Sequence, residues 1–459
     1  MPNELIFRIF GRLDAYELLP VMRILPSKNR LYECALFLLL HKVEIYYDGK
    51  NTKPECFEDI FKTIYKYQNQ SDGSQNNYSK PHVWIRYNNL PKISKYESAI
   101  KKIIIHKAEN SFCTRRPLIS KGKSKIIQCF LNRCTNVKVI ENRCGLDVDY
   151  PKSTETLKIF MEDEAKSFYM RTYGRFIIDL SKISLPTKIK QLYLKSVRFI
   201  FDITACFPTL SHLEIECSVI RNPKKLRIDR HWFPSLVTLV LRCDTMYSDP
   251  LEIDLQTPKT GNTYHNNANS VDSNSTTFLK GFQEIEHLTI IKCGDSMIPK
   301  SLQNYKALKT IDFSWNNTFR ISNSFKYLVN LVSLNLEYND IRKIENLGGL
   351  LNLEWLSLKD NEIENIEGLN LPKLKYLNIS QNRLRAIDNL QSLKVLEELD
   401  ISRSYYLKSI VGLLTVVETL VTLHCYSLPW RNFSDTDLSR LSKIKTIKSD
   451  SLMPQFPLT

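Results

Sequence analysis

One phrase of apolar residues recurs through the C-terminal part of the chain, and it constrains the fold more than any other feature. Each copy has apolar residues at positions one, four and six and, in all copies but the last, asparagine at position nine. The copies are Leu308-x-x-Ile311-x-Phe313-x-x-Asn316, Leu331-x-x-Leu334-x-Leu336-x-x-Asn339, Leu353-x-x-Leu356-x-Leu358-x-x-Asn361, Leu374-x-x-Leu377-x-Ile379-x-x-Asn382 and Leu396-x-x-Leu399-x-Ile401-x-x-Ser404. The central apolar position advances by 23, 22, 21 and 22 residues. A period of this length predicts stacked repeats in place of one globular core.

The chemistry of the phrase predicts the shape of each repeat. Alternating apolar residues indicate a short strand with one buried face. The asparagine that follows indicates a turn, because its side chain can bond neighbouring backbone groups. Apolar residues such as Ile341, Ile344 and Leu347 predict a return segment that closes the core. Since no repeat can bury its apolar face alone, stability must come from stacking.

This pattern resembles the leucine-rich repeat, which implies an α/β solenoid, or horseshoe. The period of about 22 residues and the Ile-x-x-Ile-x-x-Leu return resemble the short repeats found in the regulator of type-1 protein phosphatase. Degraded copies precede and follow the regular ones: Ile100-x-x-Ile103-x-Ile105, Cys134-x-x-Val137-x-Val139, Ile189-x-x-Leu192-x-Leu194, Leu210-x-x-Leu213-x-Ile215, Leu236-x-x-Leu239-x-Leu241, Ile285-x-x-Leu288-x-Ile290 and Leu420-x-x-Leu423-x-Cys425. Their irregular spacing predicts longer, variable repeats upstream of residue 285.

The first 40 residues precede the repeats and predict three short helices. Pro2 can open the first, and its apolar residues then fall on one helical face. Asp14 and Glu17 form a capping-box pair for the second. Ser27 can cap the third after the break at Pro26.

The phrase Pro2-Asn3-Glu4-Leu5-x-x-x-Ile9-Phe10-x-x-Leu13-x-x-x-x-Leu18 resembles an F-box. An F-box followed by an irregular repeat array is the order of F-box/leucine-rich-repeat proteins, whose F-box binds the Skp-type adaptor of a cullin–RING ubiquitin ligase. The resemblance implies an adaptor-binding surface made of Pro2, Leu5, Ile9, Phe10, Leu13 and Leu18. The family's Val-Cys-x-x-Trp segment is replaced here by Arg23-Ile24-Leu25-Pro26-Ser27. Alternatively, these helices only cap the open end of the solenoid.

Changes in composition predict five segments. They are an F-box-like helical domain at 1–40, irregular repeats at 41–255 with a polar insertion near 68–80, a disordered polar insertion at 256–277, regular repeats at 278–430, and a C-terminal cap and tail at 431–459.

Strand side chains that alternate with the buried leucines must face the concave surface. The position before the central apolar residue gives one column: Gln191, His212, Thr238, His287, Thr310, Ser333, Trp355, Tyr376, Glu398 and Thr422. Exposed Trp and Tyr are typical interface anchors. We therefore predict a partner-binding site made of Trp315, Tyr338, Trp355, Tyr376, Asp360, Asp400 and Arg403.

Composition and motifs favour a binding protein over an enzyme. Only 13 residues are glycine, and neither G-x-G-x-x-G nor G-x-x-x-x-G-K-[ST] occurs. The histidines form no catalytic or metal-binding motif, so neither cofactor nor metal is expected. The longest apolar run, 34–40, is too short to span a membrane. The 11 cysteines of the chain are scattered, which favours a reducing compartment, the cytoplasm or nucleus, rather than secretion.

Charge is uneven along the chain. The net charge is +15, whereas residues 305–400 hold 12 Lys/Arg and 13 Asp/Glu, or −1, which leaves +16 elsewhere. Basic runs can bind phosphates or an acidic protein, but no nucleic-acid-binding motif accompanies them, so nucleic acid is not the expected partner. The sequence thus predicts a non-enzymatic substrate-recognition adaptor of an SCF-type ubiquitin ligase. The alternative is a protein-interaction scaffold or phosphatase regulator without ligase attachment.

Overall fold

The computed structural model describes part of the chain and divides it into two compact units, unit 1 (Met1–Leu210) and unit 2 (Ser211–Thr459). The described residues are 31, 35, 42–46, 83–86, 98, 100–106, 121–143, 148–160, 178–179, 185–196, 199–200, 206–217, 233–243, 284–292 and 300–450. The predicted adaptor-binding residues and both polar insertions therefore lie outside the described residues. Of the predicted N-terminal helices, only Leu31 and Ala35 are described, and both are helical.

Unit 1 is built on a parallel sheet in the order β2-β1-β3-β4-β5-β7. Its strands are β1 (Lys42–Tyr46), β2 (Val83–Arg86), β3 (Lys102–His106), β4 (Val139–Asn142), β5 (Thr156–Phe160) and β7 (Gln191–Ser196). Helix α5 (Lys121–Arg133) connects β3 to β4, while β6 (Ile178–Asp179) and β8 (Phe199–Ile200) form a separate pair. Across β3, β4, β5 and β7, the sheet register aligns a row of fully buried residues: Ile103, Ile140, Leu157 and Leu192.

This register corrects one predicted repeat. The sequence phrase placed Val137 at the central position, but Ile140 pairs with Ile103 and Leu157. The phrase is therefore shifted by three residues, since Val137 is the first apolar position. Strand β5 was not predicted because Thr154, buried and fully shielded from solvent, takes the place of its first apolar residue.

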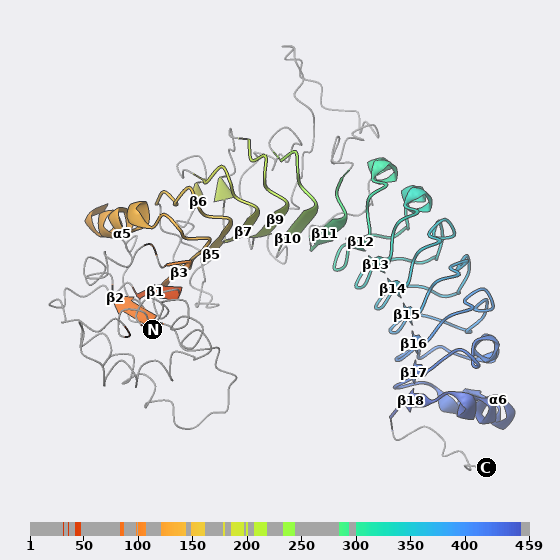
Figure 1. Cartoon of the computed structure of the whole chain (residues 1–459). Coiled ribbons are helices and arrows are strands. Elements are labelled where there is room, and N and C mark those ends of the chain that lie inside the picture. Colours follow the sequence, from red (N-terminus) through yellow and green to blue (C-terminus); the bar gives the residue numbers. More distant parts are fainter. Residues whose placement is uncertain are drawn as a thin grey trace, which may run out of the picture. The chain divides into compact units, whose positions relative to one another are not determined.

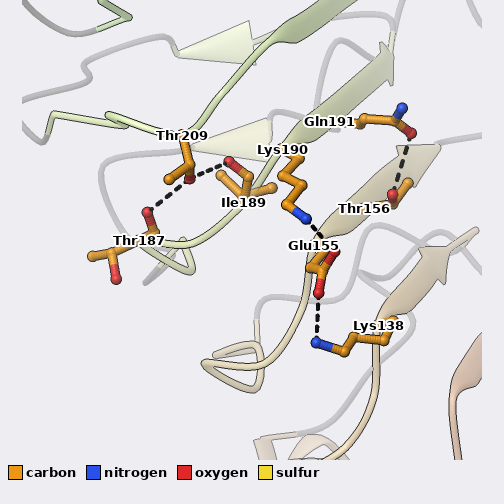
Figure 2. Close-up of polar contacts among 8 residues, drawn as sticks. All are labelled: Lys138, Glu155, Thr156, Thr187, Ile189, Lys190, Gln191 and Thr209. Atoms are coloured by element: carbon orange, nitrogen blue, oxygen red, sulfur yellow. Dashed lines mark hydrogen bonds and ion pairs between the residues drawn. The ribbon is translucent and has the colours of Figure 1, made fainter. Parts of the chain in front are cut away.

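Ionic and polar contacts join neighbouring strands of unit 1 at their N-terminal ends (Figure 2). The carboxylate of Glu155 lies between two ammonium groups, 2.5 Å from Lys138 Nζ and 2.8 Å from Lys190 Nζ. Hydrogen bonds from Lys138 and then Lys190 lower the pKa of Glu155 to about 2. On the next residues, Thr156 Oγ1 donates to Gln191 Oε1 at 3.2 Å. These contacts repeat from strand to strand, as expected of stacked repeats.

Unit 2 contains the regular repeats. Its parallel strands, in chain order, are β9 (His212–Cys217), β10 (Thr238–Cys243), β11 (His287–Ile291), β12 (Thr310–Asp312), β13 (Ser333–Asn335), β14 (Trp355–Ser357), β15 (Tyr376–Asn378), β16 (Glu398–Asp400), β17 (Thr422–His424) and β18 (Thr446–Lys448). The predicted central residues Ile311, Leu334, Leu356, Leu377 and Leu399 stand in register and are buried. The predicted leucine-rich-repeat solenoid is confirmed, and β18 adds a strand within the range predicted as a cap.

Return segments on the other side of the sheet carry short helices (Figure 1). They are η5 (Lys300–Asn304), η6 (Asn323–Tyr327), η7 (Val411–Thr415), η8 (Trp430–Asn432), α6 (Asp435–Arg440) and η9 (Leu441–Lys443). Ser434 caps α6: its Oγ accepts from Asp437 N at 3.2 Å and donates to Asp437 Oδ2 at 2.7 Å. Ser434 is thus a side-chain N-cap, and the carboxylate of Asp437 accepts from its hydroxyl.

A ladder of buried asparagines holds successive repeats together. In the middle of the array, Asn361 Nδ2 donates to Leu358 O of its own repeat at 3.0 Å and to Leu336 O of the preceding one at 2.9 Å. Its Oδ1 accepts from Ile341 N at 3.0 Å. Equivalent bonds to both carbonyls occur at Asn316, Asn339 and Asn382. In the repeat after Asn382, the equivalent residue is Ser404. Its side chain is shorter than that of asparagine, and its Oγ donates to Ile401 O of its own repeat.

Candidate functional site

The residue before each ladder position adopts left-handed backbone geometry. The φ angles are positive at Lys292, Trp315, Tyr338, Asp360, Gln381, Arg403 and Ser427. Each turn is supported by the next repeat; for example, Trp315 N donates to Glu337 O at 2.9 Å and Tyr338 N to Lys359 O at 2.9 Å. Bulky side chains rarely take this conformation, which favours Gly and Asn. A Trp and a Tyr in adjacent strained turns therefore point to a role beyond the fold.

Trp315 and Tyr338 form the first of two aromatic stacks. Their ring centroids lie 3.8 Å apart with planes 16° from parallel. Lys292 Nζ lies over the Trp315 ring at 4.9 Å, and Lys359 Nζ lies over the Tyr338 ring at 5.3 Å. A hydrogen bond with Tyr338 is the largest cause that raises the pKa of Lys359. The stack is thus flanked by a cation at each end, although 46% of the Trp315 surface remains exposed.

Trp355 and Tyr376 form the second stack, on the strands themselves. They are directly paired residues of β14 and β15. Their ring centroids lie 5.2 Å apart and their planes are 3° from parallel. Asn378 Nδ2 donates to Tyr376 Oη at 3.3 Å. The four predicted aromatic residues therefore form two separate pairs, one in the turns after the strands and one at the start of the strands.

Carboxylates surround the second stack. Burial is the largest cause that raises the pKa of Tyr376, and the negative charges of Asp400, Glu398 and Glu337 raise it further. Glu337 Oε1 accepts from Ser357 Oγ at 2.6 Å, which draws this carboxylate towards β14. The negative charges of Glu337 and Asp400 also raise the pKa of Lys359. Two of the carboxylates that raise the pKa of Tyr376, Glu337 and Asp400, thus also act on Lys359.

The structure places the other predicted site residues around these stacks. Asp400 Oδ1 accepts from Ser402 N at 2.9 Å, an Asx turn that fixes the carboxylate after β16. Arg403 Nη1 donates to Gln381 Oε1 at 3.1 Å, within the column of left-handed turns. Asp360 occupies the same column, where its N donates to Ser380 O at 3.0 Å. Asp400 belongs to the second stack, whereas Asp360 and Arg403 continue the line of Trp315 and Tyr338.

Sequence reasoning missed the two lysines of the first stack and the carboxylate of Glu337. Lys292 shares the column of Trp315, while Lys359 and Glu337 occupy the position one residue earlier. A signal for them existed, because both columns lie at a fixed offset from the central apolar residue. The strand registers of unit 2 confirm the predicted column from His212 to Thr422.

The described residues offer no metal centre or membrane span. Within the described ranges, no group of three His, Cys, Asp or Glu could hold a metal ion. Among the same residues, no helix combines the length and apolar character needed to cross a bilayer. The chemistry on this surface is that of aromatic faces, carboxylates and hydrogen-bonding groups, which suits recognition.

Comparison with known proteins relates the regular repeats to other leucine-rich repeats. A family model described as "Leucine Rich repeats (2 copies)" matches residues 351–392. The volume-regulated anion channel subunit LRRC8A of Homo sapiens is 38% identical over 91 residues, which are 19% of this chain and 11% of that protein. Adenylate cyclase of Schizosaccharomyces pombe is 30% identical over an alignment of 160 residues that covers 30% of this chain and 9% of that protein. The chain thus spans about a tenth of the length of these curated relatives.

Solved structures resemble the chain more broadly but at low identity. The leucine-rich-repeat protein LIC12759 of Leptospira interrogans aligns with 86% of this chain and 100% of its own at 15% identity and a TM-score of 0.48. TLR13 in complex with ssRNA13 aligns with 80% of this chain and 53% of its own at 15% identity and a TM-score of 0.49. The matched family model identifies residues 351–392 as leucine-rich repeats, and the strand order of unit 2 places their strands in a longer row of parallel strands.

Proposed function

We propose that this chain is a protein-interaction scaffold that binds a protein partner on the strand face of β12–β17. The observation that carries the proposal is the pair of aromatic stacks, which are partly exposed and held in fixed geometry. Ordered Trp and Tyr residues lose little conformational entropy on binding, so they suit the anchors of an interface. The carboxylates beside Tyr376 disfavour a phosphate backbone at this place. The proposed role needs no bond chemistry from the chain itself.

A more specific form of this proposal is a substrate adaptor of a cullin–RING ubiquitin ligase. Its support is the sequence resemblance of residues 1–25 to an F-box, ahead of the repeat array. The N-terminal helices would hold the Skp-type adaptor while the repeat face holds the substrate in the cytoplasm or nucleus. Such an adaptor acts by raising the effective concentration of the substrate near the ubiquitin-conjugating enzyme.

Trp355→Ala and Tyr376→Ala should each weaken capture of the partner by about 30-fold, the loss of a typical hot spot of about 2 kcal/mol. Tyr405→Ala is the matched control, because Tyr405 is 62% exposed but lies outside the predicted site. The measurement is quantitative comparison of proteins that co-purify with the full chain and each variant. A partner retained by both site variants would place the interface elsewhere.

The ligase form has its own test with purified Skp-type adaptor. The wild-type chain should bind, and Ile9→Asp should reduce binding by roughly 100-fold, because a buried unpaired charge costs several kcal/mol. Trp355→Ala should bind the adaptor like the wild type. If the folded wild-type chain does not bind, the role without ligase attachment, including that of a phosphatase regulator, takes precedence.

A further inference from the structure

The two aromatic stacks differ in how their ring faces are covered. In the first, lysines lie over both outer faces, at 4.9 Å for Trp315 and 5.3 Å for Tyr338. Among the described residues, no ammonium or guanidinium group lies over Trp355 or Tyr376. Aromatic faces attract cations through their quadrupole. Within the described part of the chain, the ring faces of the second stack are therefore not covered by a cation, unlike those of the first.

The strand residue next to this stack on the β13 side has a small side chain. The Trp355 ring stacks on Tyr376 of β15 with nearly parallel planes, so its other face is directed towards β13. The residue of β13 paired with Trp355 is Ser333, a small side chain. At the other end, Tyr376 pairs with Glu398, whose Oε1 is 2.8 Å from His424 Nε2. The paired side chain is thus small at the Trp355 end of the stack and is a carboxylate that contacts His424 at the Tyr376 end.

Three carboxylates act near this stack, and two of them, Glu337 and Asp400, also interact with the ammonium group of Lys359. Glu337 follows Ser333 on the same repeat and reaches β14 through its 2.6 Å bond from Ser357 Oγ. A carboxylate has lone pairs to accept from a second donor at the same time. Asp400 and Glu398 add to the negative field that Tyr376 experiences. This local charge contrasts with the net charge of +15 of the whole chain.

We propose that the stack of Trp355 and Tyr376 receives an arginine side chain of the protein partner. The guanidinium would lie flat on the Trp355 ring above Ser333 and donate to the carboxylate of Glu337. Arginine suits the position better than lysine, because its planar group stacks on aromatic rings and pairs with carboxylates through two parallel bonds. The inference rests on the proposed function and specifies the chemistry of the partner at that surface.

Ligand-observed saturation-transfer NMR on the full chain tests this with N-acetyl-arginine amide as the probe. N-acetyl-citrulline amide, an uncharged compound of the same shape, and N-acetyl-lysine amide serve as comparisons. We expect the arginine probe to bind with an affinity at least tenfold higher than the citrulline probe and several-fold higher than the lysine probe. Because carboxylates occur elsewhere on the chain, variants are needed to show where a bound probe lies.

Four variants locate that site. Trp355→Ala should weaken arginine binding roughly tenfold, and Glu337→Gln severalfold. Ser333→Tyr should also weaken it roughly tenfold, because a third ring would cover the Trp355 face while extending the stack. Tyr405→Ala, which removes an exposed aromatic ring outside the predicted site, should leave binding within twofold of the wild type.

The inference is overturned if the arginine probe does not bind, if the citrulline probe binds equally, or if Trp355→Ala and Ser333→Tyr leave binding unchanged. Capture of the protein partner is a separate readout. If capture still depends on Trp355 and Tyr376 while the arginine probe fails, the proposed function stands and only the arginine is excluded.

Discussion

Replacing Gly349 with alanine is expected to lower the free energy of unfolding by about 3 kcal/mol, because the new methyl group meets backbone that cannot move aside. A Cβ at this position would lie 2.2 Å from Lys326 O and 2.9 Å from Lys326 Cα. Lys326 belongs to η6 of the preceding repeat, so the clash separates two stacked repeats. The urea midpoint of the full chain, followed by circular dichroism, should fall by roughly 1 M.

The neighbouring residue provides the matched control. At Gly348, an added Cβ meets nothing within 4 Å. Gly348→Ala should therefore change stability by less than about 0.5 kcal/mol and can stabilise the chain by restricting the unfolded state. If Gly348→Ala and Gly349→Ala lowered the free energy of unfolding equally, the return segment 347–350 would not pack as described.

Asn361→Ala should lower the free energy of unfolding by about 3 kcal/mol, because it removes one asparagine of the ladder in the middle of the array. The side chain is buried and donates to Leu336 O, Leu358 O and Lys359 O at 2.9, 3.0 and 3.2 Å. The two strand carbonyls keep bonds from Asn339 and Asn382, at 3.1 and 2.9 Å. The amide of Ile341 loses the 3.0 Å acceptor that the side chain provides. This one buried donor left without its acceptor accounts for most of the expected loss of stability.

Asn352→Ala is the control for this change. Asn352 Nδ2 also bonds a carbonyl of the preceding repeat, Val329 O, at 2.8 Å, but at the exposed surface. Water can replace that bond, so its loss should cost within about 0.5 kcal/mol. The same urea titration measures both variants. If Asn352→Ala and Asn361→Ala destabilise the chain equally, burial of the ladder is not the source of its strength.

The regular repeats could be predicted from sequence because one apolar period fixes both the strands and their register. Ile311 and Leu334, for instance, are adjacent in the sheet and buried, as the spacing required. Upstream, the same rule misplaced the centre of β4 by three residues. Apolar residues at Val137, Val139 and Ile140 fit the phrase in two phases, and only pairing with neighbouring strands decides between them.

For the candidate site, the sequence predicts which residues share a column along the strands, but not which side chains contact one another. Alternation along a strand determines that Trp355 and Tyr376 share a face, and the register makes them neighbours. The stack of Trp315 and Tyr338 depends on left-handed turns outside the strands, which strand alternation does not describe. The lysines over this stack reach it through long flexible side chains. Their positions follow from three-dimensional packing and not from the period alone.

Site-specific photo-crosslinking tests the central claim, that the strand face holds a protein partner. A benzophenone amino acid would replace Thr422, in the column of Trp355, or Lys343, an exposed residue of the return segment. The account predicts a covalent adduct with the partner from position 422 and none from position 343. An adduct from position 343 without one from position 422 would contradict it and assign binding to the opposite side of the array.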